Sequence, residues 1–177
     1  MKKNYALLLL LPILLGLLSC NKDDDRPTDP VDLLPPITQT GAGTFGALVD
    51  GKPFIGNNPY FNCYYQFVDG GYYFGIGGDD DVGSLMSIII GTRHKTISEN
   101  EILRLKERVK GNAWGGGGIR GTGFPTTDGT YTGELTITKL DYTNNIVSGT
   151  FWFDLKHPAT GETVKIREGR FDTHFTQ

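Results

Sequence analysis

Ile146-Val-Ser-Gly-Thr-Phe-Trp-Phe-Asp-Leu155 is the stretch that decides the fold, because large apolar and polar residues alternate along it. Successive side chains of a β-strand point to opposite faces of the sheet. One face then carries Val147, Phe151, Phe153 and Leu155. The other face carries Ser148, Thr150, Trp152 and Asp154. The stretch therefore predicts a strand with one buried face.

The segments on either side extend this pattern. Upstream, Tyr131 to Thr138 alternates, with Leu135 and Ile137 on one face. Downstream, Glu162 to Phe175 alternates as well, but its apolar positions change phase near Gly169. Such a change of phase indicates a β-bulge.

Two hairpins are expected in the first half of the domain, at Asp50-Gly51 and at Asp69-Gly70-Gly71. Asp-Gly between apolar runs favours a tight turn, because both turn positions need a positive φ. The flanking strands are expected at 44–49 with 52–55, and at 60–68 with 72–77. A further run, Ser84 to Gly91, is apolar on both faces and is expected in the middle of the sheet.

The region from Ser98 to residue 130 departs from this alternation. Ser98 and Glu101 fit a capping box, and apolar residues follow at helical spacing, so we expect one short helix over 98–110. A strand over 101–106 is the alternative. Residues 111–130 hold eight glycines, and we expect a long loop there.

Regularly spaced short strands predict a mainly β, single-domain fold, either an antiparallel sandwich or a barrel-like sheet, over residues 41–177. The chain has 177 residues and 25 glycines, and its aromatic, Val, Ile and Thr content suits strands and turns.

The N-terminus predicts a lipoprotein. Residues 1–19 begin with two lysines and continue in an apolar run too short to span a bilayer, which indicates a signal peptide. Leu17-Leu18-Ser19-Cys20 resembles the lipobox of bacterial lipoproteins, in which the cysteine is acylated. Residues 20–40 follow as an expected flexible tether, rich in aspartate and proline. Lys22-Asp23-Asp24 resembles the surface-export signal of Bacteroidetes-type lipoproteins, so the expected location is the outer membrane, facing the exterior rather than the periplasm.

Charge and cysteine content narrow the possible functions. Without Lys2 and Lys3 the chain keeps 15 of its 17 basic residues against 20 acidic ones, a net charge of −5. No basic run offers a phosphate-binding surface, so nucleic acid is not an expected partner. Cys63 remains as the second cysteine, and its aromatic surroundings favour a buried side chain over a catalytic thiol.

Both ends of the domain resemble an uncharacterised family of Bacteroidetes lipoproteins. The resemblance rests on Leu34 to Gly41 running into Thr44 to Phe54, on Ile146 to Leu155, and on Val164 to Phe175 with Gly169-Arg-Phe-Asp172. Ala47 stands where such proteins often have cysteine. The resemblance implies a lipid-anchored β-rich protein and carries no assigned activity.

Candidate ligand-binding residues gather in the expected glycine-rich loop: Trp114, Arg120 and Phe124, joined by Trp152 from the strand. Exposed aromatic residues beside an arginine are typical of glycan or peptide recognition. For Trp114 the favoured interpretation is that it packs back onto the sheet. Trp152 is either covered by a helix or loop, for which the expected helix is the obvious candidate, or exposed for binding.

Metal and cofactor chemistry receive little support. Asp79-Asp80-Asp81 could bind Ca²⁺, but a solvated turn is the favoured interpretation, because the spacing is not that of an EF-hand. No phosphate-binding or nucleophile motif is present, and no cofactor or catalytic residue is expected.

The expected function is a non-enzymatic binding or accessory role for a glycan or protein ligand at the cell surface. A small surface hydrolase and a structural envelope component are the alternatives.

Overall fold

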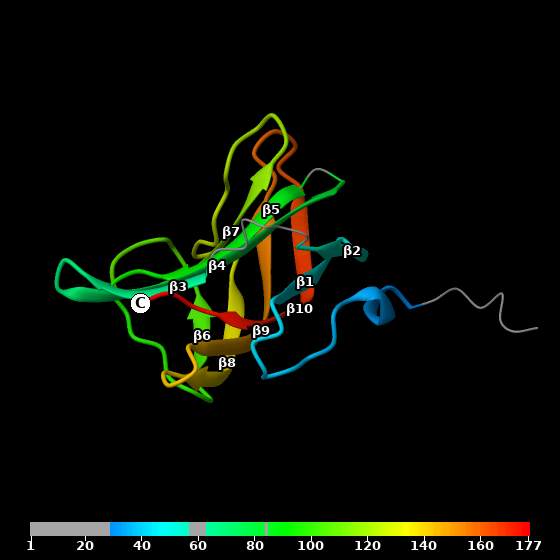
Figure 1. Cartoon of the computed structure of the whole chain (residues 1–177). Coiled ribbons are helices and arrows are strands. Elements are labelled where there is room, and N and C mark those ends of the chain that lie inside the picture. Colours follow the sequence, from blue (N-terminus) through cyan, green and yellow to red (C-terminus); the bar gives the residue numbers. More distant parts are fainter. Residues whose placement is uncertain (1–28, 57–62, 84) are drawn as a thin grey trace, which may run out of the picture.

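The computed structural model describes residues 29–56, 63–83 and 85–177, and these form a mainly β protein (Figure 1). Ten strands make one sheet, in the order β2-β1-β10-β9-β8-β6-β7-β5-β4-β3. The strands are β1 (Thr44–Val49), β2 (Lys52–Ile55), β3 (Cys63–Val68), β4 (Gly71–Val82), β5 (Leu85–Thr92), β6 (Ile102–Leu105), β7 (Ala113–Ile119), β8 (Gly133–Asp141), β9 (Ile146–Lys156) and β10 (Thr163–His174). All pairs are antiparallel except β6 with β7, so the expected antiparallel β domain is confirmed.

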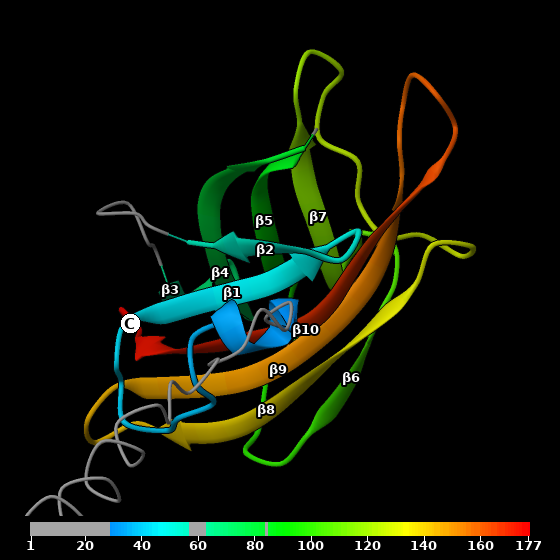
Figure 2. The ribbon, with the colours of Figure 1, turned by 90° about the vertical axis from the view of Figure 1, so that its right-hand side faces the viewer.

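The sheet curls into two layers without closing. In Figure 2, β1, β10, β9 and β8 lie in front of β4, β5 and β7. The last residues of the chain run beside β3, where the Tyr65 amide donates to the Thr176 carbonyl at 2.8 Å. On the other side, the Ile55 amide at the end of β2 donates to the Asp80 carboxylate at 2.7 Å. The result combines the two layers of a sandwich with the curvature of a barrel.

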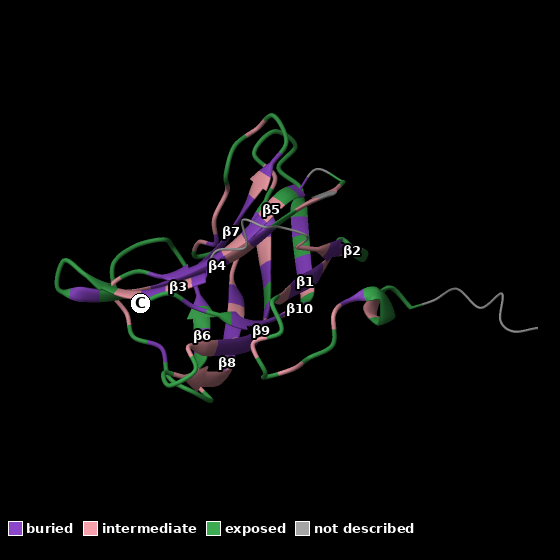
Figure 3. Ribbon diagram, viewed as in Figure 1, coloured by how far each residue is buried: buried purple, intermediate pink, exposed green. Residues whose placement is uncertain are grey.

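A single aromatic and aliphatic core fills the space between the layers. Its largest fully buried side chains include Phe45, Phe54, Phe74 and Phe153. Along the strands, buried residues alternate with more exposed ones (Figure 3). In β9 the buried residues include Val147, Phe151, Phe153 and Leu155, as the alternation predicts.

The turn predictions are confirmed. Asp50 and Gly51 have φ values of 48° and 80°, and Asp69 and Gly70 have 48° and 78°. Each pair joins two antiparallel strands, β1 with β2 and β3 with β4. The first strand of the second hairpin was expected to begin at residue 60, which lies outside the described residues. The predicted bulge is present as well, because the register of β9 and β10 shifts between Ile166 and Gly169.

The helix expected over 98–110 is wrong, and the alternative strand is confirmed as β6. The local bond that suggested a helix cap forms, since the Ser98 amide donates to Glu101 Oε2 at 2.9 Å. Asn100, however, has a φ of 64°, which turns the chain out of a helical path. Leu103 and Leu105 are buried and Val109 is exposed, so the apolar period is two rather than three to four.

The loop expected over 111–130 is also wrong in part, because β7 occupies residues 113–119 between β5 and β6. Its glycines stand where neighbouring side chains need the space. A Cβ at Gly115 would lie 3.0 Å from the Phe153 ring, and one at Gly117 would lie 2.7 Å from Leu85 Cδ1. The side chains that bury β7 therefore belong to neighbouring strands and not to β7 itself.

The second part of the expected tether packs against the domain. Residues Pro30–Leu33 form a short 3₁₀ helix, η2, and Leu34 after it is buried. Residues 38–42 are held by hydrogen bonds to the buried Asp172. Residues 29–40, which were expected in the tether, are therefore packed against the domain, while Cys20 and the signal segment lie outside the described residues. In the part of the chain that the structure describes, no helix has the length and apolar character to cross a membrane.

Candidate ligand-binding groove

The four aromatic and arginine candidates divide over different parts of the sheet. Trp114 in β7 and Phe124 in the following loop come together, with ring centroids 6.5 Å apart and nearly perpendicular planes. Arg120 follows the end of β7, is exposed, and does not line the same groove. Trp152 lies in β9, in the other layer.

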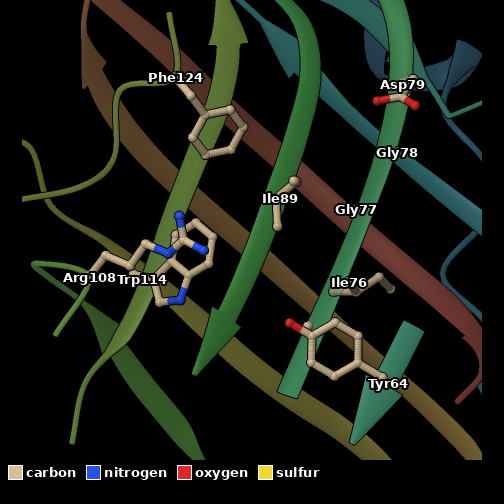
Figure 4. Close-up of a pocket in the computed structure, with 10 residues that line it drawn as sticks. Tyr64, Ile76, Gly77, Gly78, Asp79, Ile89, Arg108, Trp114 and Phe124 are labelled. Carbon is tan, nitrogen blue, oxygen red and sulfur yellow. The ribbon is translucent and has the colours of Figure 1, made fainter. Parts of the chain in front are cut away.

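A groove of about 460 Å³ lies beside Trp114, on the outer face of β3, β4, β5 and β7 (Figure 4). We call it the Trp114 groove. Its lining residues come from these four strands and from the segments on either side of β7: Tyr64, Gly75, Ile76, Gly77, Gly78, Asp79, Ile89, Arg108, Trp114 and Phe124.

One row of paired residues crosses the groove at one end. Tyr64 pairs with Gly75, Gly75 with Gly91, and Gly91 with Trp114. The Tyr64 ring covers Gly75, because a Cβ there would lie 2.4 Å from Tyr64 Cζ. The Trp114 indole reaches over Gly91, where a Cβ would lie 3.3 Å from Nε1. Two glycines without side chains thus leave room for two aromatic rings that lie over neighbouring strands.

Trp114 is held by two contacts. The Arg108 guanidinium lies over its ring, 4.2 Å from the centroid, and the Phe124 ring meets it edge-on. The side chain is only 5% exposed, and its Nε1 is buried without a hydrogen-bond partner among the described residues. A buried N–H group without an acceptor is unfavourable, and a bound acceptor group would satisfy it.

Sequence reasoning therefore identified two groove residues and missed others. It paired Trp114 with Arg120, whereas the turn after β6 places Arg108 on the indole. Tyr64 and Asp79 were missed as partners because they arrive from distant strands. A signal was available in the alternate glycines Gly75 and Gly77, since glycine at every second position flattens one face of a strand.

The turn expected at Asp79-Asp80-Asp81 is wrong, because these residues lie in β4, and the side chains of Asp79 and Asp80 do not form one cluster. Asp79 lines the groove at the end away from the Tyr64 and Trp114 row (Figure 4). Asp80 accepts the hydrogen bond from the Ile55 amide. The side chain of Asp81 lies outside the described residues. Among the side chains that the structure describes, no three His, Cys, Asp or Glu residues form a metal-binding group.

Trp152 lines a second, more polar groove of about 340 Å³ on the other layer, together with Glu134, Thr150 and Arg167. It is 40% exposed, so of the two alternatives the covered one is wrong. The Arg167 guanidinium lies 5.3 Å from the ring centroid. Arg167 also pairs with Asp154 at 2.7 Å and donates to the Ile166 and Phe153 carbonyls. Its guanidinium is therefore already bound within the protein.

Cys63 is buried in the core, and burial raises the pKa of its thiol well above the ordinary value. A thiol that stays protonated is a poor nucleophile. The geometry agrees with the interpretation of Cys63 as a small core residue.

Comparisons of this chain with protein-family models, with curated proteins and with solved structures found no match.

Proposed function

We propose that this chain is a lipid-anchored, non-enzymatic binding protein of the cell surface, and that the Trp114 groove captures a small ring-shaped ligand such as a sugar unit of a glycan. The observation that carries the proposal is the row across the groove, in which the Tyr64 ring and the Trp114 indole lie over directly paired glycines. The half-buried Tyr64 ring offers a flat apolar contact together with a hydroxyl group, which suits a ring with both apolar faces and hydroxyls. The Trp114 indole, 5% exposed under the Arg108 guanidinium, borders the groove on the other side.

The groove has the size and mixture of groups expected for such a ligand. Its volume of about 460 Å³ lies within the range of small-molecule sites. Ile89 and the backbone at Gly77 form an apolar floor, while Asp79 and Arg108 supply polar groups at opposite ends. A floor without large side chains lets a flat ring approach the sheet closely.

A glycan hydrolase is less well supported by this groove. Glycoside hydrolysis uses two carboxyl groups on either side of the scissile bond. Among the described lining residues of the Trp114 groove, Asp79 is the one carboxylate. A structural envelope component would need no groove at all, so the binding experiment below also separates that alternative.

The proposal is tested by screening the purified full-length protein in detergent on a glycan array and measuring the affinity of the best ligand. Tyr64→Ala and Trp114→Phe are expected to weaken binding at least tenfold, about 1.4 kcal/mol. Trp152→Ala is the matched control, because Trp152 lies in the other layer, and its affinity should be unchanged. Absence of any glycan ligand, or loss of binding in Trp152→Ala with Tyr64→Ala unaffected, would contradict the assignment.

A further inference from the structure

Hydrogen-bond donors without acceptors gather at one end of the Trp114 groove. The Trp114 Nε1–H is buried and has no hydrogen-bond partner among the described residues. The Arg108 guanidinium contacts the indole ring, and no carboxylate among the described residues pairs with it. The Tyr64 hydroxyl has no hydrogen-bond partner in the described part of the chain. The Tyr64 ring covers Gly75, which pairs with Gly91, and the edge of the Trp114 indole lies over Gly91.

We propose that this end of the groove binds the carboxylate of an acidic sugar, with the sugar ring over the floor toward Asp79. The inference rests on the proposed glycan-binding function and names its ligand class. A carboxylate has two oxygens that accept hydrogen bonds and matches the planar guanidinium of arginine. It would satisfy the Trp114 Nε1–H and neutralise Arg108 in one step.

The charge of the groove favours a monoanion over a phosphate. Arg108 is the one cation and Asp79 the one anion among its described lining residues. A phosphate group carries up to two negative charges at neutral pH, and the second charge would meet no cation here. Asp79 can accept hydrogen bonds from sugar hydroxyls at the other end, about 13 Å along β4 from Gly75 at 3.3 Å per residue.

A peptide C-terminus carries the same group but fits this surface less well. Peptides that bind sheets usually add a strand at an exposed edge. Of the four strands under the groove, β4, β5 and β7 are each paired on both sides, and the end of the chain hydrogen-bonds to β3 at Cys63 and Tyr65. Main-chain hydrogen bonds are therefore not offered to a peptide, whereas a ring lying flat on the face needs none.

The chain has two tryptophans, so their indole N–H resonances provide a direct measurement. The ¹⁵N-labelled full-length protein in detergent is titrated with glucuronate, galacturonate and N-acetylneuraminate. Glucose, galactose and a tripeptide with a free C-terminus serve as comparison ligands. The spectrum of Trp114→Phe assigns the two peaks. We expect an acidic sugar to shift the Trp114 resonance and to bind at least tenfold more tightly than its neutral counterpart.

Substitution of Arg108 tests the role of the charge. Arg108→Gln should remove the preference for the acidic sugar, and Trp114→Phe should weaken its binding. Arg104→Gln, another exposed arginine but in β6, should change neither. The preference should also fall with added salt, since Arg108 is exposed.

The outcomes separate the two proposals. If neutral sugars shift the Trp114 resonance as strongly as acidic ones, or if Arg108→Gln keeps the preference, the acidic-sugar inference is wrong while glycan binding stands. If the tripeptide binds and no sugar does, both the ligand class and the glycan function are wrong. If no ligand shifts Trp114 while the array detects a glycan, the site lies elsewhere and the inference fails.

Discussion

Asp172 shows how one buried carboxylate fixes the entry of the chain into the domain. It is 1% exposed and accepts hydrogen bonds from the Thr38 and Ser148 hydroxyls and from the Thr40, Gly41 and Ala42 amides. Burial alone raises the pKa of this carboxyl, but the bonds led by Thr38, Thr40 and Ser148 outweigh it and hold the pKa well below its usual range. The segment that precedes β1 is thus fastened to β9 and β10.

Asp172→Asn is expected to lower the stability of the domain by about 2–4 kcal/mol at pH 7, because an amide directs its own N–H groups at donors that need acceptors. The depressed pKa sets the pH dependence. The contribution of the carboxylate is complete above the unfolded pKa of about 3.9 and is lost as the pH falls toward the folded pKa. Urea unfolding between pH 7 and pH 3 measures the free energy of unfolding of both proteins. The difference between wild type and Asp172→Asn should narrow below about pH 4.

A constant difference between Asp172→Asn and wild type down to pH 3 would show that the carboxylate charge contributes nothing. Thr38→Val is a useful companion variant, since it removes one donor and leaves the charge. Its effect should be smaller than that of Asp172→Asn.

Residue identity alone explains why the site was only partly predictable. Trp114 and Phe124 are close in sequence, and their type suggested recognition. The choice between Arg108 and Arg120 depends on where the chain turns after β6, which no residue pattern expresses. Tyr64 lies opposite Trp114 only because β3 reaches β7 through two intervening strands.

At the scale of the element, β9 could be predicted as a strand from its hydrophobic periodicity, whereas β7 could not. In β9 the apolar residues supply their own alternation, so the strand was predicted. In β7 the inward positions Gly115 and Gly117 carry no side chain, and Phe153, Leu85 and Leu155 fill the space above them. The information that makes β7 a strand therefore lies in other strands.

Gly117→Ala is expected to destabilise the domain by about 1–3 kcal/mol through overpacking. Its Cβ would lie 2.7 Å from Leu85 Cδ1 and 2.8 Å from the Ser87 carbonyl oxygen, so the backbone of β5 would have to move. Gly129→Ala is the matched control, because its Cβ would meet only the Glu107 carboxylate at 3.3 Å, at the end of a flexible side chain. Thermal unfolding of the two variants measures the contrast, and equal stabilities would contradict the packing account of β7.

β6 gives a second element-scale prediction, since the helix and strand interpretations bury different residues. Leu105→Ala should lower the free energy of unfolding by about 2–5 kcal/mol, because Leu105 is fully buried. Val109→Ala should change it by no more than about 0.5 kcal/mol, because Val109 is 54% exposed. A helix over 98–110 would place both residues on its buried face, so similar losses in chemical denaturation would favour the helix.

For the whole molecule, the fold class could be predicted because most strands carry their own alternation and turn residues. The strand order could not, since it depends on which faces meet across the core.

Docking of residues 29–42 also bears on the expected anchor at Cys20. Pro30 in η2 is the tenth residue after Cys20, and a chain of ten residues reaches at most about 35 Å. If Cys20 is acylated, the domain is held near the membrane rather than at the end of a long tether.

The anchor itself is tested with the two cysteines of the chain. Cys20→Ala is expected to abolish labelling by a fatty-acid analogue and to release the protein from the membrane fraction. Cys63→Ala is the control and should remain labelled, because Cys63 is buried and its thiol stays protonated. One acyl chain binds a membrane only weakly, whereas two or more give stable attachment, so release should be complete rather than partial. Labelling that persists in Cys20→Ala and disappears in Cys63→Ala would place the lipid on Cys63. The proposal of a protein anchored to the surface through Cys20 would then be wrong.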